Sequence, residues 1–265
     1  MSSYPELEEA QRKWRYRPPS DLLQGRVLLV TGASSGIGRV AARCYALYGA
    51  NVVLLGRNQA LLESLFDCIS AETETDPAIV PVDLETLTEA SANELADHIS
   101  DHYGTLNGIL HNAGLLGSLT PIAHYDVDLW QRVMQVNATA PFILTKALFP
   151  LLDESGDASV VFTTSGVGNR GRAYWGAYAV SKFALEGLSQ VLADETETAG
   201  RIRVNTLNPG ATRTTMRAAA VPGEDPAELP PPEAHMDLYL YLMGADSHRL
   251  HGTRIDARNW SPEGL

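Results

Sequence analysis

A glycine-rich turn that follows an apolar run constrains this chain more than any other feature. Residues Val27–Thr31 lead directly into Gly32-Ala33-Ser34-Ser35-Gly36-Ile37-Gly38, after which a helical pattern begins. Glycines at a strand-to-helix turn let the backbone approach a pyrophosphate, and the helix N-terminus offers free N–H groups and a favourable dipole. The spacing Gly-x-x-x-Gly-x-Gly is a variant of the dinucleotide-binding fingerprint. The turn therefore predicts a dinucleotide site, with a plain structural turn as the alternative. The predicted contacts are Gly32, Ser34, Ser35, Gly36, Ile37 and Gly38.

Short β-branched runs alternate with longer helical stretches along most of the chain. The expected strands are Val27–Thr31, Asn51–Leu55, Ala78–Val82, Gly108–His111, Ser159–Thr164 and Arg203–Asn208. The expected helices are Ile37–Tyr48, Gln59–Glu72, Glu85–His102, Val127–Leu152, Trp175–Thr198 and Pro232–Met243. Strand–helix alternation predicts a parallel sheet with helices on both faces. The predicted fold class is therefore α/β, a three-layer doubly wound parallel sheet (Rossmann fold) in a single domain, with ligands at the carboxyl ends of the strands.

Two segments lie outside this alternation. Residues 1–24 form an N-terminal extension, and residues 25–265 form the expected catalytic domain. The extension is expected to pack on the sheet edge or on a partner subunit, with a loosely held surface arm as the alternative. A substrate-loop insertion is expected near residues 211–232, where five prolines follow the end of a strand. This segment is either a lid over the pocket or only a connector.

The composition excludes several classes of function. A net charge of −12 argues against binding to nucleic acid and against docking on anionic membranes, because both need a basic face. No apolar run is long enough to cross a bilayer, and the polar N-terminus lacks the apolar core of a secretory signal, so a cytoplasmic protein is expected. The two cysteines indicate no disulfide framework, and the seven histidines show no metal-ligand spacing, so no metal is expected.

The end of the second expected strand bears on the choice of dinucleotide. Enzymes that prefer NAD usually place an acid here for the ribose 2′-hydroxyl, whereas this chain has Gly56 followed by Arg57. An arginine pairs with a 2′-phosphate, which an acid would repel. NADP(H) is therefore the preferred cofactor and NAD(H) the alternative, while the competing interpretation of Arg57 is an exposed surface cation. Asp83 and Leu84 are expected at the adenine, although Asp83 equally suits an N-cap of the next helix.

Tyr178 and Lys182 lie four residues apart on an expected helix and so share one face. A free tyrosine titrates near pH ~10, and a neighbouring ammonium favours the phenolate and lowers its pKa. Ser165 ends the fifth expected strand, and its hydroxyl is suited to hold a substrate carbonyl oxygen beside the phenol. The Tyr–Lys pair alone is weak evidence, since most such pairs on helices are amphipathic packing. Its combination with Ser165 and the glycine turn predicts a centre for hydride transfer.

These features together resemble the short-chain dehydrogenase/reductase family over about residues 26–215. Thr31-Gly32-x-x-x-Gly36-x-Gly38 resembles the cofactor motif of that family. Asn112-Ala113-Gly114 resembles its Asn-Ala-Gly motif, and Asn208-Pro209-Gly210 followed by Thr214 resembles the motif that contacts the nicotinamide end of the cofactor. The tetrad of catalytic residues is matched by Asn137, Ser165, Tyr178 and Lys182. Besides the glycine turn, the resemblance implies cofactor contacts from Asn112, Ala113, Gly114, Tyr178, Lys182, Pro209, Gly210, Thr212 and Thr214.

The resemblance also implies a role for each member of the tetrad. Tyr178 would act as general acid in ketone reduction and as base in alcohol oxidation. Lys182 would bind the nicotinamide ribose and lower the pKa of Tyr178, and Ser165 would orient the substrate oxygen. Asn137 would hold a water that links Lys182 to solvent, with a satisfied polar residue inside a bend as the alternative. Asn112 is also suited to a structural role, tying neighbouring strands together.

The C-terminal part departs from the family pattern. Many members carry an Asp-Gly-Gly segment where this chain has Arg254-Ile255-Asp256-Ala257-Arg258, so a last strand is expected but the usual assembly is in doubt. The family suggests a homodimer or homotetramer through the long helices around residues 127–152 and 175–198. Within the family, the chain is most similar to the YciK-type oxidoreductases of bacteria, in Gly56-Arg57-Asn58, in residues 111–117 and in its tail.

The expected function is an NADP(H)-dependent short-chain oxidoreductase that interconverts a small-molecule carbonyl and an alcohol. A nicotinamide-binding regulator or redox sensor without turnover is one alternative, and an epimerase or dehydratase of the same superfamily is another. The candidate apolar lining of the substrate pocket is Leu115, Leu116, Trp175 and Met216. Arg170 and Arg172 either meet an anionic substrate or form solvated surface.

Overall fold

Seven parallel strands form one sheet in this computed structural model, which describes residues 4–264. The strand order is β3-β2-β1-β4-β5-β6-β7, and each neighbouring pair is parallel. The winding reverses between β1 and β4, the position at which doubly wound sheets bind ligands. The strands are β1 (Val27–Thr31), β2 (Asn51–Gly56), β3 (Ala78–Pro81), β4 (Gly108–His111), β5 (Ala158–Thr163), β6 (Ile202–Asn208) and β7 (Thr253–Asp256).

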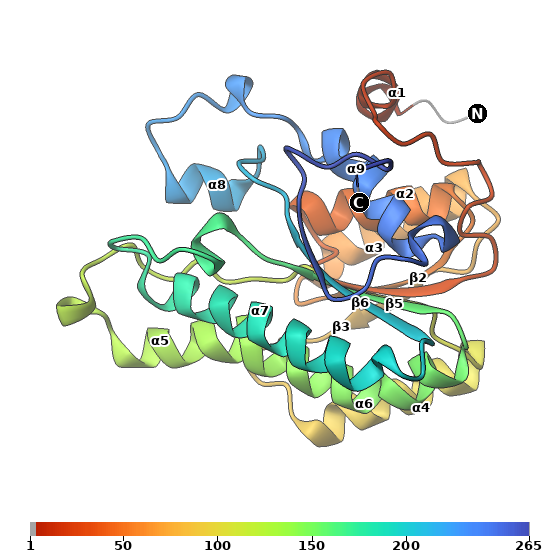
Figure 1. Cartoon of the computed structure of the whole chain (residues 1–265), viewed down its shortest axis with the longest axis horizontal. Helices are drawn as coiled ribbons and strands as arrows, with labels where there is room; N and C mark the ends of the chain where they lie inside the picture. The colour runs from red at the N-terminus through yellow and green to blue at the C-terminus, as the bar shows by residue number, and fades with distance from the viewer. Residues whose placement is uncertain (1–3, 265) are drawn as a thin grey trace.

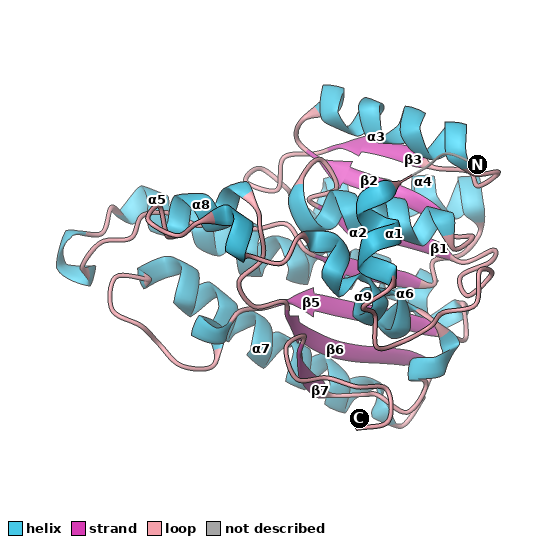
Figure 2. Ribbon diagram, turned by 90° about the horizontal axis from the view of Figure 1, so that it is seen from above, coloured by secondary structure: helices cyan, strands magenta, loops and turns pink. Residues whose placement is uncertain are grey.

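Helices cover both faces of the sheet, as Figures 1 and 2 show from two directions. One layer holds α2 (Gly36–Leu47), α3 (Gln59–Glu72) and α9 (Met236–Met243). The opposite layer holds α4 (Glu89–Tyr103), α5 (Val127–Met134), α6 (Ala140–Glu154) and α7 (Gly176–Glu197). The predicted three-layer doubly wound fold in a single domain is confirmed, and so is a last strand, β7, which pairs with β6.

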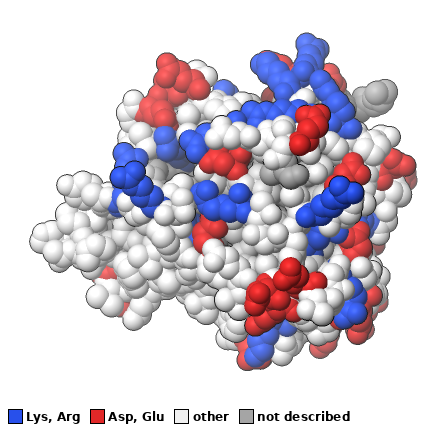
Figure 3. All heavy atoms as spheres, in the orientation of Figure 1, with Lys and Arg blue, Asp and Glu red and all other residues white. Residues whose placement is uncertain are grey.

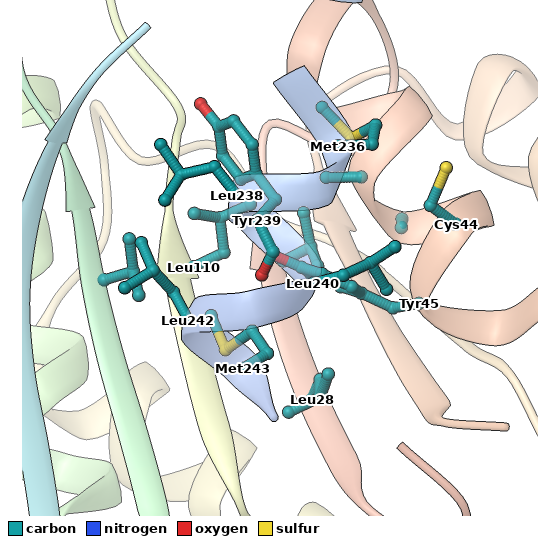
Figure 4. Close-up of a cluster of buried hydrophobic side chains, with 14 of the residues drawn as sticks. Leu28, Cys44, Tyr45, Leu110, Met236, Leu238, Tyr239, Leu240, Leu242 and Met243 are labelled. Atoms are coloured by element: carbon teal, nitrogen blue, oxygen red, sulfur yellow. The ribbon is translucent and has the colours of Figure 1, made fainter. Parts of the chain in front are cut away.

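Alternating side chains of β1, an interior strand of the sheet, belong to two separate hydrophobic cores. Leu28 and Val30 of β1 belong to the hydrophobic cluster around α2 and α9, whereas Leu29 belongs to the cluster on the opposite face. All eight residues of α9 are buried, and all except Asp237 are apolar or aromatic, as expected of a helix that is enclosed on every side. Figure 4 shows why: α9 lies between the sheet at Leu28 and the α2 residue Tyr45.

The helix expected over Val127–Leu152 is interrupted. An α-helical segment ends at Met134, a π-helical turn spans Gln135–Thr139, and α6 follows. Pro141 lies in the first turn of α6 and has no N–H to bond the carbonyl four residues earlier, that of Asn137, so the regular ladder is broken here. This turn holds the buried side chain of Asn137.

Two further helix boundaries differ from the sequence prediction. The helix expected from Glu85 begins at Glu89, because Thr88 and Ser91 form a reciprocal capping box. Asp83 is therefore not the N-cap of this helix; its carboxylate accepts a hydrogen bond of 3.0 Å from the N–H of Glu85 in the preceding turn. The helix expected over Pro232–Met243 begins with a 3₁₀ turn, Pro232–His235, before α9.

The N-terminal extension is packed on the body of the protein. It contains α1 (Pro5–Gln11) and continues over the layer of α2 and α9 rather than along either edge strand (Figure 1). Leu7, Ala10, Trp14 and Tyr16 are buried there and belong to the same hydrophobic cluster as α9. The extension is thus an ordered arm, in contrast to the loosely held alternative.

The proline-containing segment after β6 forms short helices above the carboxyl end of the sheet. It contains α8 (Thr215–Ala220) and a 3₁₀ turn, Pro226–Glu228. Two nitrogens of Arg217 donate to the carboxylate of Glu224 at 2.5 and 2.6 Å, and this bond fixes the segment internally. No helix among residues 4–264 has the length and apolar character needed to cross a membrane.

Candidate active site

A cavity of about 340 Å³ lies at the carboxyl ends of the strands, where the winding reverses. Its walls include the glycine turn after β1, the ends of β2 to β6, the start of α7 and the segment through α8. Most of the predicted site residues line it: Gly32, Ser34, Ser35, Gly36, Ile37, Arg57, Asp83, Leu84, Asn112, Ala113, Gly114, Ser165, Tyr178, Lys182, Pro209, Gly210, Thr212 and Thr214. Gly38 and Asn137 are not on its wall and lie behind it.

The glycine turn is closed too tightly for side chains. A Cβ atom at Gly38 would lie 2.5 Å from the carbonyl oxygen of Gly32 and 2.6 Å from Nδ2 of Asn112. Gly32 and Gly36 have positive φ angles of 71° and 55°, which L-residues with side chains rarely adopt. Ser35, the N-cap residue of α2, makes no capping hydrogen bond with its side chain. The first N–H groups of α2 therefore face the cavity without a side-chain partner, which suits an anion such as a pyrophosphate.

Asn112 connects the glycine turn to the neighbouring strand. The N–H groups of Asn112 and Ala113 both donate to Oγ1 of Thr31 at 3.0 Å, and Nδ2 of Asn112 donates to the Thr31 carbonyl at 3.4 Å. These bonds tie the end of β4 to the end of β1. Asn112 thus has the structural role that was considered for it, and it also lines the cavity.

Charged side chains gather at the end of the cavity near β2 and β3. The Arg57 side chain is 65 % exposed, and its Nη1 lies 3.7 Å from Oε1 of Glu85. Arg132 donates to both carboxylate oxygens of Glu85, at 2.7 and 3.0 Å, and these bonds lower the pKa of Glu85. Arg57 is therefore in loose contact with an acid that already has a closer partner. The Arg57 guanidinium is therefore still able to bind a second anion.

The other end of the cavity is buried and holds Ser165, Tyr178 and Lys182. Tyr178 and Lys182 come from the first two turns of α7, and Ser165 lies two residues beyond the end of β5. Nζ of Lys182 donates to the carbonyl oxygen of Thr163 at 2.8 Å and lies 5.5 Å from the centre of the Tyr178 ring. Gly168 permits the close packing of this loop on α7, since a Cβ there would lie 2.8 Å from Cβ of Lys182.

Burial sets the protonation of both titratable groups. Burial raises the pKa of the Tyr178 phenol to about 12, and a hydrogen bond with Ser165 acts in the opposite direction. Burial lowers the pKa of Lys182 from its ordinary 10.5 to about 8, partly opposed by the carboxylate of Glu186. Desolvation is the main cause of both shifts, because it penalises the charged phenolate and the charged ammonium alike.

Asn137 lies behind the cavity with its side-chain amide fully engaged. Its Oδ1 accepts from the N–H of Leu115 at 2.7 Å, while its Nδ2 donates to the Leu115 carbonyl and to Oγ of Ser181, both at 2.9 Å. The side chain therefore fixes the loop after β4 against α7. This arrangement agrees with the interpretation of Asn137 as a satisfied polar residue in a bend. Oδ1 of Asn137 and Nζ of Lys182 both lie beside Gly114, at 3.7 and 3.8 Å from the position of a Cβ there.

Sequence reasoning missed several residues of the cavity wall. Thr163, Thr164 and Val82 lie at the last positions of their strands or just beyond them, so strand ends were the available signal. Glu85 had no local signal, because its partners Arg57 and Arg132 are distant in sequence. Arg217 was not singled out, although its partner Glu224 is only seven residues away. The four apolar candidates, Leu115, Leu116, Trp175 and Met216, all line the cavity. Arg170 and Arg172 do not. Among residues 4–264, no group of three acidic, histidine or cysteine side chains is arranged to hold a metal ion.

Comparison with known proteins assigns this architecture to one family. A family model for short chain dehydrogenases matches residues 26–225. The chain is 52 % identical to the uncharacterised oxidoreductase YciK of Escherichia coli K12 over 94 % of its own length and 98 % of that protein. It is similar to a solved structure of the oxidoreductase YciK from E. coli, with a TM-score of 0.90 and 53 % identity, over 93 % of this chain and 100 % of the other.

A second solved structure adds a ligand to the comparison. A short chain dehydrogenase from E. coli CFT073, crystallised as a complex with NADPH, is similar with a TM-score of 0.89 and 54 % identity. The similarity covers 91 % of this chain and 100 % of that chain. By its sequence, its fold and its relatives, the chain belongs to the short-chain dehydrogenase/reductase family and is an NAD(P)-dependent oxidoreductase.

Proposed function

We propose that the protein is an NADP(H)-dependent oxidoreductase that interconverts a small-molecule carbonyl and an alcohol, with Tyr178 as general acid and base. One observation carries this proposal. A buried tyrosine and lysine and a half-buried serine share a cavity with a glycine turn at the start of a helix. The first group suits proton transfer and the second suits a pyrophosphate, so one ligand that fills the cavity meets both.

The residues of the cavity fit NADP(H) along its length. The N–H groups at the start of α2 face the expected pyrophosphate, and Arg57 lies at the end of β2 where a ribose 2′-phosphate is expected. No Asp or Glu occupies the end of β2 to repel that phosphate. The similar protein that was crystallised with NADPH supports the same cofactor here. When bound, this cofactor would supply the hydride for reduction or accept it in oxidation.

The buried residues divide the remaining chemistry among them. With a pKa of about 12, the Tyr178 phenol is protonated at neutral pH and is able to donate its proton to a carbonyl oxygen as reduction proceeds. Ser165 hydrogen-bonds to Tyr178 and would hold the same substrate oxygen. The Lys182 ammonium lies beneath the ring and would favour the phenolate that remains after the proton has left.

The wall around these residues favours an uncharged substrate. Leu115, Leu116, Trp175 and Met216 are apolar, and the nearby Arg217 is neutralised by its bidentate bond to Glu224. Substrate pockets of this kind are mostly apolar with a few polar groups that fix orientation. We propose a neutral ketone, aldehyde or alcohol rather than an anion as the substrate.

Exposed apolar side chains on α6 and α7 support a homodimer or homotetramer. Phe142, Val180, Phe183 and Val191 are between 43 % and 57 % exposed, and α6 and α7 belong to the long helices expected to mediate assembly. Burial of such side chains in an interface removes apolar surface from water. We place the protein in the cytoplasm, where NADP(H) and small carbonyl compounds are both at hand.

A panel of neutral carbonyl compounds, assayed in parallel with NADPH and NADH, tests the proposal. We expect oxidation of NADPH with at least one ketone or aldehyde, and Tyr178→Phe should lower kcat by at least about 100-fold while the NADPH dissociation constant stays unchanged. Tight binding of NADPH without any turnover would instead support a regulator or redox sensor. Conversion of a substrate without net consumption of NADPH would support an epimerase or dehydratase.

A further inference from the structure

The N-terminal arm, residues 4–24, lies outside the segment that the family model matches, which begins at residue 26. It nevertheless makes specific contacts with the C-terminal part of the chain. The arm carries a concentration of basic side chains in an acidic protein, and Figure 3 shows them at the upper right, over α1. Two series of contacts, each made of hydrogen bonds joined by a short stretch of backbone, lead from this arm to one loop of the cavity, Asn208–Thr212.

The first series runs through the segment before α9. The indole Nε1 of Trp14 donates to the carbonyl oxygen of Glu233 at 3.0 Å, and the Tyr4 hydroxyl donates to the Glu233 carboxylate at 2.5 Å. Two residues further on, the ring Nε2 of His235 and Oγ1 of Thr212 are hydrogen-bonded at 3.1 Å. All of these contacts are buried or half-buried, and Thr212 lines the cavity.

The protonation of His235 supports this first series. Burial lowers the pKa of His235 to about 4, and the positive charge of Arg15 acts in the same direction. His235 is therefore neutral at neutral pH, and its contact with Thr212 does not switch near pH 7. The acidic Asp237, two residues later, accepts a hydrogen bond of 2.8 Å from the backbone N–H of Arg15.

The second series runs through the C-terminal segment. The Arg15 guanidinium donates to the carbonyl oxygens of Ala257, Arg258 and Trp260 at 3.3, 2.9 and 2.6 Å. In the same segment, Asp256 accepts from Nδ2 of Asn208 at 2.9 Å. The Arg258 side chain also packs on the loop, where its Cδ would lie 3.3 Å from a Cβ at Gly210, and it is fixed by two hydrogen bonds to Asp256.

We infer that the N-terminal arm positions the loop Asn208–Thr212, and with it the nicotinamide end of the cofactor site. The loop's side-chain partners, His235 and Asp256, both belong to segments that the arm holds in place. Without the arm's donors, the carbonyls of residues 233, 257, 258 and 260 would lose these partners, and the loop would sample more conformations. Trp14 and Arg15 are thus positioning residues. The inference rests on the proposed function, because it assumes that this loop contacts the nicotinamide half.

Comparison of two ligands in the same variant tests the inference. NADPH reaches both ends of the cavity, whereas adenosine 2′,5′-bisphosphate represents only the adenosine end. The test variant combines two substitutions. Trp14→Phe removes one hydrogen bond and keeps an aromatic ring, and Arg15→Met removes the three hydrogen bonds of the Arg15 side chain. We expect the NADPH dissociation constant to rise about tenfold and that of the bisphosphate to change less than about twofold.

Two further variants make the result decisive. Arg12→Met removes the same charge from the same arm, and the Arg12 side chain makes no hydrogen bond or ion pair within residues 4–264, so both affinities should stay unchanged. Arg15→Met alone serves if the double variant folds poorly, because the Arg15 side chain is exposed, and we expect a rise of about threefold for NADPH.

The outcomes separate this inference from the proposed function. A selective loss of NADPH affinity supports the positioning role, since a merely structural role would lower thermal stability and leave the ratio of the two affinities unchanged. An equal loss for both ligands, or no loss for either, overturns the inference while the proposed function stands. Failure of the unaltered protein to bind NADPH refutes the proposed function itself, and the inference with it.

Discussion

The two ends of the cavity achieve recognition by opposite physical means. At the β2–β3 end, Arg57 is 65 % exposed and only loosely paired with Glu85, so its charge interacts through a solvent-rich environment. At the α7 end, Tyr178 and Lys182 are only 9 % and 3 % exposed, and burial raises the pKa of Tyr178 to about 12 and lowers that of Lys182 to about 8. The exposed end is suited to selecting a ligand by charge, and the buried end to transferring a proton.

This difference follows from how strongly water screens each group. Exposed ion pairs contribute little and depend on salt, because water already solvates both partners. A buried titratable group responds strongly to its neighbours, because desolvation makes its charged form costly. Substitutions at the buried end should therefore change turnover, whereas substitutions at the exposed end should change cofactor preference. Each prediction below tests one side of this comparison.

The largest effect is expected from Ser165→Ala at the buried end. Loss of the hydroxyl removes the hydrogen bond to Tyr178 and the donor for the substrate oxygen, so kcat should fall about 100-fold with the NADPH dissociation constant unchanged. Steady-state kinetics and NADPH titration measure the two quantities. Ser155→Ala is the matched control, because that hydroxyl bonds to the Leu152 carbonyl far from the cavity and its loss should leave kcat intact. A Ser165→Ala enzyme with full activity would remove the serine from the reaction.

The pH profile should report the titration of Lys182. Its pKa is lowered to about 8 by burial, so the ammonium is lost as the pH rises through that value. We expect kcat/KM for reduction to be level below about pH 8 and to fall up to about tenfold per pH unit above it. Lys182→Arg, whose guanidinium stays charged, should show a lower rate and no such decline.

The contribution of Lys182 to the free energy of unfolding should increase over the pH range in which the activity falls. The folded pKa of Lys182 lies below the ordinary 10.5, so the unfolded chain binds the additional proton between about pH 8 and 10.5. For this group, the free energy of unfolding therefore rises with pH across that window. Thermal denaturation at pH 8 and pH 9.5 would show whether a loss of activity is accompanied by unfolding, which would contradict the assignment to Lys182.

A smaller and selective effect is expected from Arg57→Ala at the exposed end. Without the guanidinium, KM for NADPH should rise about tenfold, while KM for NADH should change less than about twofold. Parallel kinetics with both cofactors measure the selectivity. Arg249→Ala removes an exposed arginine that does not line the cavity and should change neither value. An equal change for both cofactors would show that Arg57 does not recognise the 2′-phosphate.

The smallest effect, of opposite sign, is expected from Glu85→Gln. The amide no longer attracts Arg57 or repels a 2′-phosphate, so KM for NADPH should fall, by no more than about threefold. The effect should shrink further in high salt, since Arg57 and Arg132, the two partners of Glu85, are both exposed. A rise in KM after this substitution would mean that Glu85 orients Arg57 for the cofactor rather than competing for it.

Local patterns allowed much of this protein to be predicted from the sequence. Strands such as Val27–Thr31 appear as continuous apolar runs because both of their faces are buried, and the structure places that strand at the predicted residues. The glycine turn is equally local, since its tight closure requires residues without a Cβ. Tyr178 and Lys182 are four apart on a helix, so their shared face follows from helix geometry alone.

Contacts between distant segments could not be predicted in the same way. The arm partners Trp14 and Glu233 are more than two hundred residues apart, and no local spacing relates them. The break in the helix at Gln135–Thr139 depends on Pro141. It also depends on the hydrogen bonds that Asn137 makes with Leu115 and Ser181, which are distant in sequence. Periodicity instead favoured one continuous helix, which the structure shows to be wrong.

The sequence by itself thus determined the fold class, the position of the glycine turn and most of the candidate residues of the cavity wall, because these depend on short-range periodicity and on backbone sterics. Only the tertiary structure decided how those residues behave. It buries Tyr178 so deeply that its pKa rises instead of falling, it leaves Arg57 exposed beside Glu85, and it places the N-terminal arm behind the loop Asn208–Thr212. Burial and long-range pairing set these properties, and neither is encoded in the spacing of neighbouring residues.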